Sequence, residues 1–236
     1  MTGICFTKQK ELIDAGKLSD WKLKVFGVGS IGSNLIKQAA LVGFKDISAY
    51  DFDTVEAENI GSQEFRVEHI GMKKTEAIQK MMKGDFNFEV RAIDGKITKD
   101  TTILPEAKTI YFCGFDSLGG RKILWDKIKD FPIVWSESRI GRTAQRYYIV
   151  DLRNKNEEWT KEYEATLDPN GPMTELKCGE KGCYPSNAEL VSKIVRQFVN
   201  IAENKVFATM YIGDWGSPGE VYRMPKQEVP REIKYD

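Results

Sequence analysis

The sequence has little of several residue types, and each scarcity argues against a class of function. His69 is the only histidine. With no second histidine and no clustered acids, a catalytic triad or a histidine-based metal site has little support. Four cysteines in 236 residues do not make a disulfide framework, which favours a reducing, cytoplasmic compartment. The 35 basic and 35 acidic residues cancel, so we expect no nucleic-acid partner that needs a large basic surface.

Long apolar runs are also missing. No run approaches the roughly 20 residues that span a membrane, and residues 1–5 lack the charged and apolar regions of a signal peptide. We therefore expect no membrane partner. The length is sufficient for one domain with a sizeable core. We expect residues 1–236 to form that single domain, with a polar lead-in over 1–20 and a mobile tail over 225–236.

The strongest positive signal is a glycine-rich turn between an apolar run and a helical pattern. Three glycines in Gly-x-Gly-x-x-Gly spacing follow the run at Gly27, Gly29 and Gly32. Gly27 permits a tight turn, and Gly29 lets the backbone approach a phosphate closely. Gly32 lets the helix pack against the sheet. The turn therefore predicts a phosphate-binding site at the start of a helix.

An acidic residue stands at the distance that nucleotide binding requires. A second strand is predicted over residues 46–50, and it ends at Asp51, 22 residues after Gly29. A spacing of roughly 20 residues is typical of the acid that accepts a hydrogen bond from a ribose hydroxyl. The helix between them would direct free N–H groups, the first of them at Ser30 and Ile31, toward a phosphate. This strand–turn–helix–strand order predicts a Rossmann-like nucleotide-binding unit.

The sequence after this strand carries further motifs. It reads Asp51-Phe52-Asp53-Thr54-Val55, then Asn59 and Gln63, then Gly71 and Lys74. Over roughly residues 5–150 the chain resembles the ThiF/MoeB/HesA family, the bacterial relatives of ubiquitin-activating enzymes. The resemblance implies ATP- and Mg²⁺-dependent adenylation of a C-terminal carboxylate. The implied substrate is a ubiquitin-like or sulfur-carrier protein or a peptide, and the implied assembly is a homodimer.

The resemblance also implies roles for single residues. Besides the glycine turn, the nucleotide-binding residues that it implies are Asp51, Asp53, Asn59, Gln63 and Lys74. Asn59 and Lys74 would also assist catalysis, Lys74 by binding phosphate. Asp116 follows a predicted buried strand at 109–113 and corresponds to the aspartate that holds magnesium. Alternatively, Asp116 caps the helix predicted over residues 118–128.

Two positions differ from the family pattern. Ser62 stands where the family has an arginine that helps to hold the triphosphate. Arg66 could replace that arginine if its segment is helical. Lys8 stands near the place of an N-terminal arginine that reaches ATP in the partner subunit, but a lysine lacks the bidentate fork. Alternatively, Lys8 is only a solvated surface charge.

The second half of the chain predicts an extension of the sheet. We expect strands at 131–136, 143–150 and 206–213, the second of them antiparallel to its neighbours, and an amphipathic helix at 187–203. The predicted fold is α/β, a Rossmann-like and mostly parallel sheet with an antiparallel extension. The resemblance implies that a polar loop over residues 154–186 crosses the active site.

That loop carries two cysteines, Cys178 and Cys183. One of them could accept the activated carboxylate as a thioester, or both could be ordinary loop cysteines. The arginines near the predicted antiparallel strand are Arg139, Arg142 and Arg146. Each is a candidate contact for an anionic tail or phosphate, and solvated charge is the alternative for each.

Two other functions remain open. A non-catalytic relative could bind a nucleotide or a partner without turnover, which Ser62 keeps possible. An oxidoreductase that uses NAD(H) shares the glycine motif. It gives no reason for the joint presence of Asn59, Gln63, Lys74 and Asp116, so adenylation is favoured.

Overall fold

The structure, a computed structural model, describes residues 3–141, 143–154, 156–168 and 182–224. Five parallel strands form one part of its sheet: β1 Lys22–Phe26, β2 Asp46–Asp51, β3 Val90–Asp94, β4 Thr109–Cys113 and β5 Val134–Gly141. Three antiparallel strands continue it: β6 Ala144–Asp151, β7 Met210–Asp214 and β8 Ser217–Arg223. The strand order is β3-β2-β1-β4-β5-β6-β7-β8, which confirms the predicted mostly parallel sheet with an antiparallel extension.

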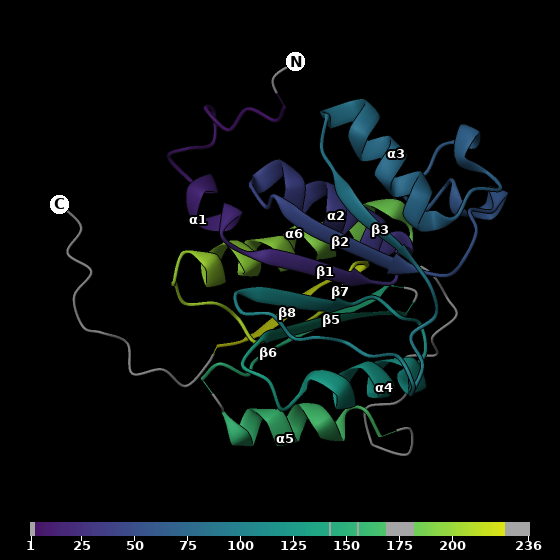
Figure 1. The fold of residues 1–236 in the computed structure, drawn as a ribbon. Coiled ribbons are helices and arrows are strands. Elements are labelled where there is room, and N and C mark those ends of the chain that lie inside the picture. Colours follow the sequence, from purple (N-terminus) through teal and green to yellow (C-terminus); the bar gives the residue numbers. More distant parts are fainter. Residues whose placement is uncertain (1–2, 142, 155, 169–181, 225–236) are drawn as a thin grey trace.

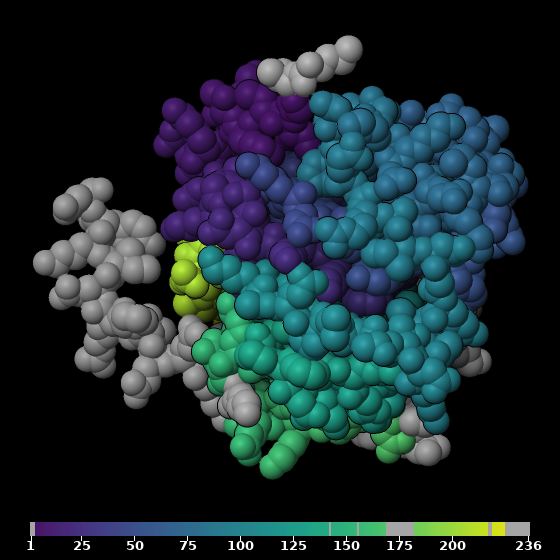
Figure 2. All heavy atoms as spheres, in the orientation of Figure 1, coloured from purple at the N-terminus to yellow at the C-terminus, as the bar shows by residue number. Residues whose placement is uncertain are grey.

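Helices cover both faces of this sheet (Figure 1). They are α1 Ala15–Ser19, α2 Ser30–Val42, α3 Lys74–Phe86, α4 Leu118–Ile128, α5 Glu157–Ala165 and α6 Tyr184–Ala202, with 3₁₀ turns η1 Ala57–Asn59 and η2 Val67–His69. One core cluster lies between the sheet and α2, α3 and α6, and a second lies between the sheet and α4 and α5. In the space-filling view, the purple and blue first part of the chain lies above the teal and green part (Figure 2). Within the described ranges, no helix is long and apolar enough to cross a membrane.

The parallel strands are buried because helices cover both of their faces. Every residue of β4 is buried, as its near-continuous apolar run predicts. The strand predicted at 131–136 begins only at Val134 and continues to Gly141. Phe131 lies in the turn after α4 and is 42% exposed. The reason is Pro132, which has no N–H to offer a strand ladder.

The loop predicted over 154–186 is partly wrong, because it contains helix α5. Asn156 caps this helix by accepting a hydrogen bond from the Trp159 amide at 3.0 Å. Trp159 and Tyr163 are one helical turn apart, and both are buried in the second core cluster. Their packing therefore stabilises a segment whose other residues are mostly polar. Residues 169–181 lie outside the described part of the chain.

The second half differs from prediction at two further places. Helix α6 begins at Tyr184, with Cys183 as its N-cap, instead of at 187 as predicted. Pro185 explains the earlier start, because proline suits the first turn of a helix. Strand β8 was not predicted, and Gly219 within it lowers strand propensity. The predicted tail at 225–236 lies outside the described residues.

Candidate functional site

One cavity lies at the carboxyl ends of the parallel strands. The residues that directly follow β1, β2, β3 and β4 all line it: Gly27, Phe52, Gly95 and Gly114. The cavity has a volume of about 480 Å³. Open α/β sheets bind their ligands at this edge, where the strand order reverses on either side of the first strand. The position of the cavity therefore follows from the topology.

The glycine turn forms one wall of the cavity. Gly27 has a φ of +95°, a conformation that favours glycine. A Cβ at Gly32 would lie 1.9 Å from the Gly27 carbonyl oxygen, so Gly32 permits close packing without itself lining the cavity. A Cβ at Gly29 would meet nothing within 4 Å. Gly29 is the N-cap of α2, and no side chain caps this helix. The first helical residues, Ser30 and Ile31, line the cavity, so their N–H groups are available to an anion there.

Asp51 connects the second strand to this turn. Its Oδ2 accepts a hydrogen bond from the Val28 amide at 2.6 Å, and its Oδ1 accepts one from the Asp53 amide at 2.8 Å. The side chain is buried and lines the cavity. Each carboxylate oxygen has two lone pairs, so Asp51 can also accept a hydrogen bond from a ligand hydroxyl.

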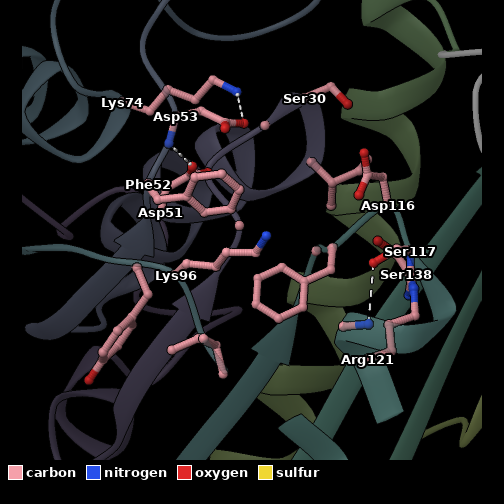
Figure 3. Close-up of a pocket in the computed structure, with 18 of the residues that line it drawn as sticks. Ser30, Asp51, Phe52, Asp53, Lys74, Lys96, Asp116, Ser117, Arg121 and Ser138 are labelled. Atoms are coloured by element: carbon pink, nitrogen blue, oxygen red, sulfur yellow. Dashed lines mark hydrogen bonds and ion pairs between the residues drawn. The ribbon is translucent and has the colours of Figure 1, made fainter. Parts of the chain in front are cut away.

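Lys74 and Asp53 form an ion pair at the start of α3. The Lys74 Nζ lies 3.0 Å from the Asp53 Oδ2, and the lysine is buried while the aspartate is half-exposed. Figure 3 shows the pair at one side of the cavity, near Ser30. The neighbouring Lys73 donates to the Phe52 carbonyl at 2.7 Å and does not line the cavity. Of the two adjacent lysines, Lys74 is therefore the one placed to contact a phosphate.

Asp116 lies on the opposite side of the cavity (Figure 3). Its carboxylate is exposed. The alternative prediction that it caps α4 is wrong, because the cap is Ser117, whose hydroxyl accepts from the Gly120 amide at 3.2 Å. Among the described residues, no three histidine, cysteine or acidic side chains gather as a metal site. A single free carboxylate fits a Mg²⁺ ion that arrives with a nucleotide and takes its other ligands from phosphate and water.

Of the two predicted nucleotide-binding residues Asn59 and Gln63, only Gln63 lines the cavity. Gln63 is buried and lines the cavity, and its Oε1 has no hydrogen-bond partner within the described segments. Asn59 is also buried, but its Oδ1 accepts from the Glu56 amide at 3.0 Å, inside turn η1. It does not line the cavity. The orphaned oxygen of Gln63 would suit a ligand with a hydrogen-bond donor.

Three residues in the N-terminal half of the chain do not line the cavity. Arg66 precedes η2 with an extended backbone, so its segment is not the helix that its predicted role requires. Its guanidinium pairs with Asp85. Lys8 is exposed and does not line the cavity. His69 is buried, and its Nδ1 accepts from the Arg66 amide at 3.1 Å. Burial lowers its pKa.

Two of the predicted arginine contacts, Arg139 and Arg146, do not line the cavity either. Arg139 is buried, and its Nε donates to the Glu137 Oε1 at 2.6 Å. Arg146 is half-buried on β6 and does not line the cavity. Arg142 lies outside the described residues. The position of Arg139 therefore gives no support to a direct contact with an anionic tail.

The start of α6 is fastened beside the cavity. Gly182 lines the cavity, and the next residue, Cys183, is exposed. The Tyr184 hydroxyl donates to the Glu64 Oε1 at 2.5 Å, and the Lys37 Nζ lies 2.7 Å from the Glu64 Oε2. Glu64 thus ties α6 to α2. Cys178 lies outside the described residues.

Several lining residues were missed by sequence reasoning. Lys96, two residues after β3, lies over the Phe52 ring with its Nζ 5.3 Å from the ring centroid. Arg121 and Ser138 line the far wall. The signal for Lys96 was its position just past a parallel strand. Arg121 stands where the family resemblance also has an arginine, although no role was assigned to it. The place of Ser138 depends on contacts between distant segments, which spacing in the sequence does not reveal.

Comparisons with known proteins agree with this geometry. Residues 5–202 match the ThiF family. The chain is 37% identical over 83 residues to SUMO-activating enzyme subunit 2 of Dictyostelium discoideum, covering 34% of this chain and 13% of that protein. It is 31% identical over 127 residues to the NEDD8-activating enzyme E1 catalytic subunit of Caenorhabditis elegans, covering 52% and 29%. The matches thus span less than a third of these relatives.

Solved structures share the fold at low identity. Escherichia coli MccB with AMPCPP and MccA superposes with a TM-score of 0.69 at 15% identity, over 91% of this chain and 67% of that chain. MccB with ATP gives a TM-score of 0.67 at 15% identity, over 89% and 65%. These likenesses concern the fold alone.

Proposed function

The chain belongs to the ThiF family, and on that premise we propose that it adenylates the C-terminal carboxylate of a ubiquitin-like or sulfur-carrier protein or of a peptide. The observation that carries the proposal is the cavity, where the glycine turn, Lys74 and Asp116 line one space. Relatives named for NEDD8 and SUMO activation, and a structural neighbour solved with ATP, support it.

The proposed nucleotide position follows from the donors and acceptors present. The uncapped start of α2 offers N–H groups to the phosphates, and Lys74 adds a positive charge beside them. Asp51 has spare lone pairs for a ribose hydroxyl. Asp116 would hold the Mg²⁺ ion, which supplies charge neutralisation on the phosphates when bound.

The proposed reaction needs no general base, because a carboxylate is already ionised at neutral pH. A carboxylate oxygen of the acceptor attacks the α-phosphorus, the bond from that phosphorus to the bridging oxygen breaks, and pyrophosphate leaves with the electron pair. The product is an acyl-adenylate. Lys74 and the N–H groups of α2 stabilise the charge that develops, and the cavity holds the two reactants together.

A thioester step could follow at Cys183. This residue is exposed at the start of α6, next to Gly182 in the cavity wall. Its sulfur would attack the acyl carbonyl carbon and lose its proton to solvent, the bond from that carbon to the AMP oxygen would break, and AMP would leave with the electron pair. Cys178 is the alternative acceptor.

One observation favours a second candidate, nucleotide binding without turnover. Ser62 replaces the family arginine, and the possible substitute Arg66 is paired with Asp85 away from the cavity. In this case the protein would bind MgATP but would not catalyse ATP–pyrophosphate exchange with any C-terminal peptide. Exchange that depends on a peptide carboxylate would exclude this candidate.

Titration calorimetry tests the nucleotide site before an acceptor is known. Wild type, Asp116→Asn and Asp126→Asn are titrated with MgATP, with ATP plus EDTA, and with NADH. Asp126 is a matched control, because it lies on α4, the helix that follows Asp116, and pairs with Lys122. We expect Asp116→Asn alone to lose about tenfold of the Mg²⁺-dependent affinity, roughly 1.4 kcal/mol. Tight NADH binding with indifference to ATP would instead favour an oxidoreductase.

A further inference from the structure

Three ionisable side chains form a buried cluster at the far wall of the cavity. Arg121 comes from α4, and Glu137 and Arg139 come from β5; their side chains are 4%, 0% and 4% exposed. The Arg121 Nη1 donates to the Glu137 Oε2 at 3.1 Å, and the Arg139 Nε donates to the Glu137 Oε1 at 2.6 Å. One carboxylate is therefore shared by two guanidinium groups.

The two arginines are used differently. Arg139 also donates from Nη1 to the Thr166 carbonyl at 2.9 Å and from Nη2 to the Thr166 hydroxyl at 2.8 Å. All three of its nitrogens are thus bonded. The Nε of Arg121, by contrast, has no hydrogen-bond partner among the residues that the structure describes. Only Arg121 of the pair lines the cavity, so the guanidinium with an unused donor is the one that lies at the cavity wall.

The cluster carries a net charge of +1, since two guanidinium groups face one carboxylate. Two titratable neighbours of the cluster, Cys113 and Tyr163, do not cancel this charge. Burial raises the pKa of Cys113 to about 12 and raises the pKa of Tyr163 well above its ordinary value, so both are neutral at pH 7. Within the described ranges, Asp116 forms no ion pair with Arg121. A buried charge without a counter-ion is unfavourable, and an anion in the cavity would relieve it.

A second cation in the cavity wall, near the glycine turn, is already balanced. Lys74 is paired with Asp53, and this pair lies beside Ser30, where phosphates would bind (Figure 3). Arg121 lies across the cavity, near Ser138 (Figure 3). Ser138 belongs to β5, which leads into the antiparallel strands. The part of the cavity wall at Arg121 is therefore separate from the part formed by Ser30 and Lys74, where phosphates would bind.

We propose that the Arg121 guanidinium binds the carboxylate of the acceptor and holds it opposite the phosphates. The inference rests on the proposed function and deepens it. A guanidinium is a planar fork that matches a carboxylate with two parallel hydrogen bonds. Glu137 and Arg139 then act as positioning residues. Glu137 holds the Arg121 side chain by a hydrogen bond, and Arg139 holds Glu137 in the same way.

Arginine Nε–H signals in ¹⁵N–¹H spectra test this assignment without catalysis. The probe is N-acetyl-glycylglycine, titrated with and without AMPCPP, and its C-terminal amide is the control that lacks the carboxylate. Arg121→Lys identifies the Arg121 signal by its loss. We expect that signal to move with the carboxylate probe and not with the amide. The Arg139 signal should stay in place, because its Nε is already bonded to Glu137.

Two results would overturn the proposal. If AMPCPP alone moves the Arg121 signal and the carboxylate probe adds nothing, Arg121 is a phosphate ligand. If neither moves it, Arg121 binds no anion. Failure of the proposed function has a different signature: AMPCPP would leave the Gly29 and Lys74 amide signals unshifted, while the probe alone can still move Arg121. We also expect Arg121→Lys to weaken the probe about tenfold without weakening AMPCPP.

Discussion

The Asp51 carboxylate accepts a hydrogen bond from the Val28 amide at 2.6 Å and so fastens the end of β2 to the glycine turn after β1. The residue that the motif predicts for a ribose hydroxyl therefore also holds two strand ends together. Both carboxylate oxygens are in use before any ligand arrives. The Asp51 side chain thus affects both nucleotide binding and the stability of the fold.

Asp51→Ala should destabilise the protein even without nucleotide. The change leaves the Val28 amide without its acceptor, which costs about 1–3 kcal/mol when the donor is buried. Urea unfolding in nucleotide-free buffer measures this loss. Asp46→Ala, at the half-buried start of the same strand, is the control and should change stability by less than about 0.5 kcal/mol. Equal stability of Asp51→Ala and wild type would show that these hydrogen bonds contribute nothing.

Gly32→Ala should disrupt the turn, because its Cβ would lie 1.9 Å from the Gly27 carbonyl oxygen. We expect a loss of about 1–3 kcal/mol in the free energy of unfolding and weaker ATP binding. Gly84→Ala in α3 is the matched control, since a Cβ there meets nothing within 4 Å. That control should gain about 0.5–1 kcal/mol. Thermal unfolding of both variants distinguishes close packing at Gly32 from a general effect of removing glycine.

Lys74→Ala should weaken ATP binding, and Lys73→Ala should not. Only Lys74 lines the cavity, although the two lysines are adjacent. A hydrogen bond to a charged group contributes about 1.5–3 kcal/mol, so we expect affinity to fall roughly 10- to 150-fold in calorimetry. Equal losses in both variants would argue against a specific phosphate contact by Lys74.

Arg66→Ala should leave ATP affinity unchanged. The guanidinium pairs with Asp85 and does not line the cavity. Because the Arg66 side chain is about half exposed, its loss should cost no more than about 1 kcal/mol of stability. A clear fall in ATP affinity would show that Arg66 moves into the cavity and replaces the arginine missing at Ser62.

Stability should fall as the pH falls below about 6.5, because of His69. Burial lowers the pKa of His69 in the folded protein, while an unfolded histidine titrates near pH 6.5. The unfolded state therefore takes up the proton first. The stabilisation is complete above about pH 6.5 and is lost toward the lower folded pKa, by at most about 1.4 kcal/mol per pH unit.

Urea unfolding of wild type and His69→Asn between pH 5 and 7.5 measures this effect. The asparagine Oδ1 can replace Nδ1 as acceptor for the Arg66 amide. His69 is the only histidine, so the variant should lack this pH dependence in that range. The same slope in both proteins would assign the effect to other groups.

Part of the site followed from local spacing and part from the family resemblance. Spacing indicated Gly29 and Asp51, the resemblance implied Gln63, Lys74 and Asp116, and all five line one cavity. Gly29, Asp51, Lys74 and Asp116 each lie near a strand end or a helix start, where the topology fixes their place. The homodimer, the cytoplasmic location and the roles of Lys8, Cys178 and Cys183 stay predictions.

Other features could not be predicted because they depend on contacts between distant segments. The Arg121–Glu137 pair joins a helix to a strand 16 residues later. The sequence of neither segment indicates that these two side chains meet. Helix α5 is stabilised by burial of Trp159 and Tyr163 against the sheet. Its mostly polar sequence resembles a loop until that packing is known.

The contact between Tyr184 and Glu64 has a consequence for the order in which the cavity is completed during synthesis. These residues are 120 positions apart, and Gly182 of the cavity wall lies at the same late point of the chain. Chains emerge from the ribosome N-terminus first, at about 5–20 residues per second. The glycine turn is therefore made several seconds before Tyr184 can reach Glu64. A nascent chain shorter than this holds the glycine turn and α2 before α6 is tied to them through Glu64.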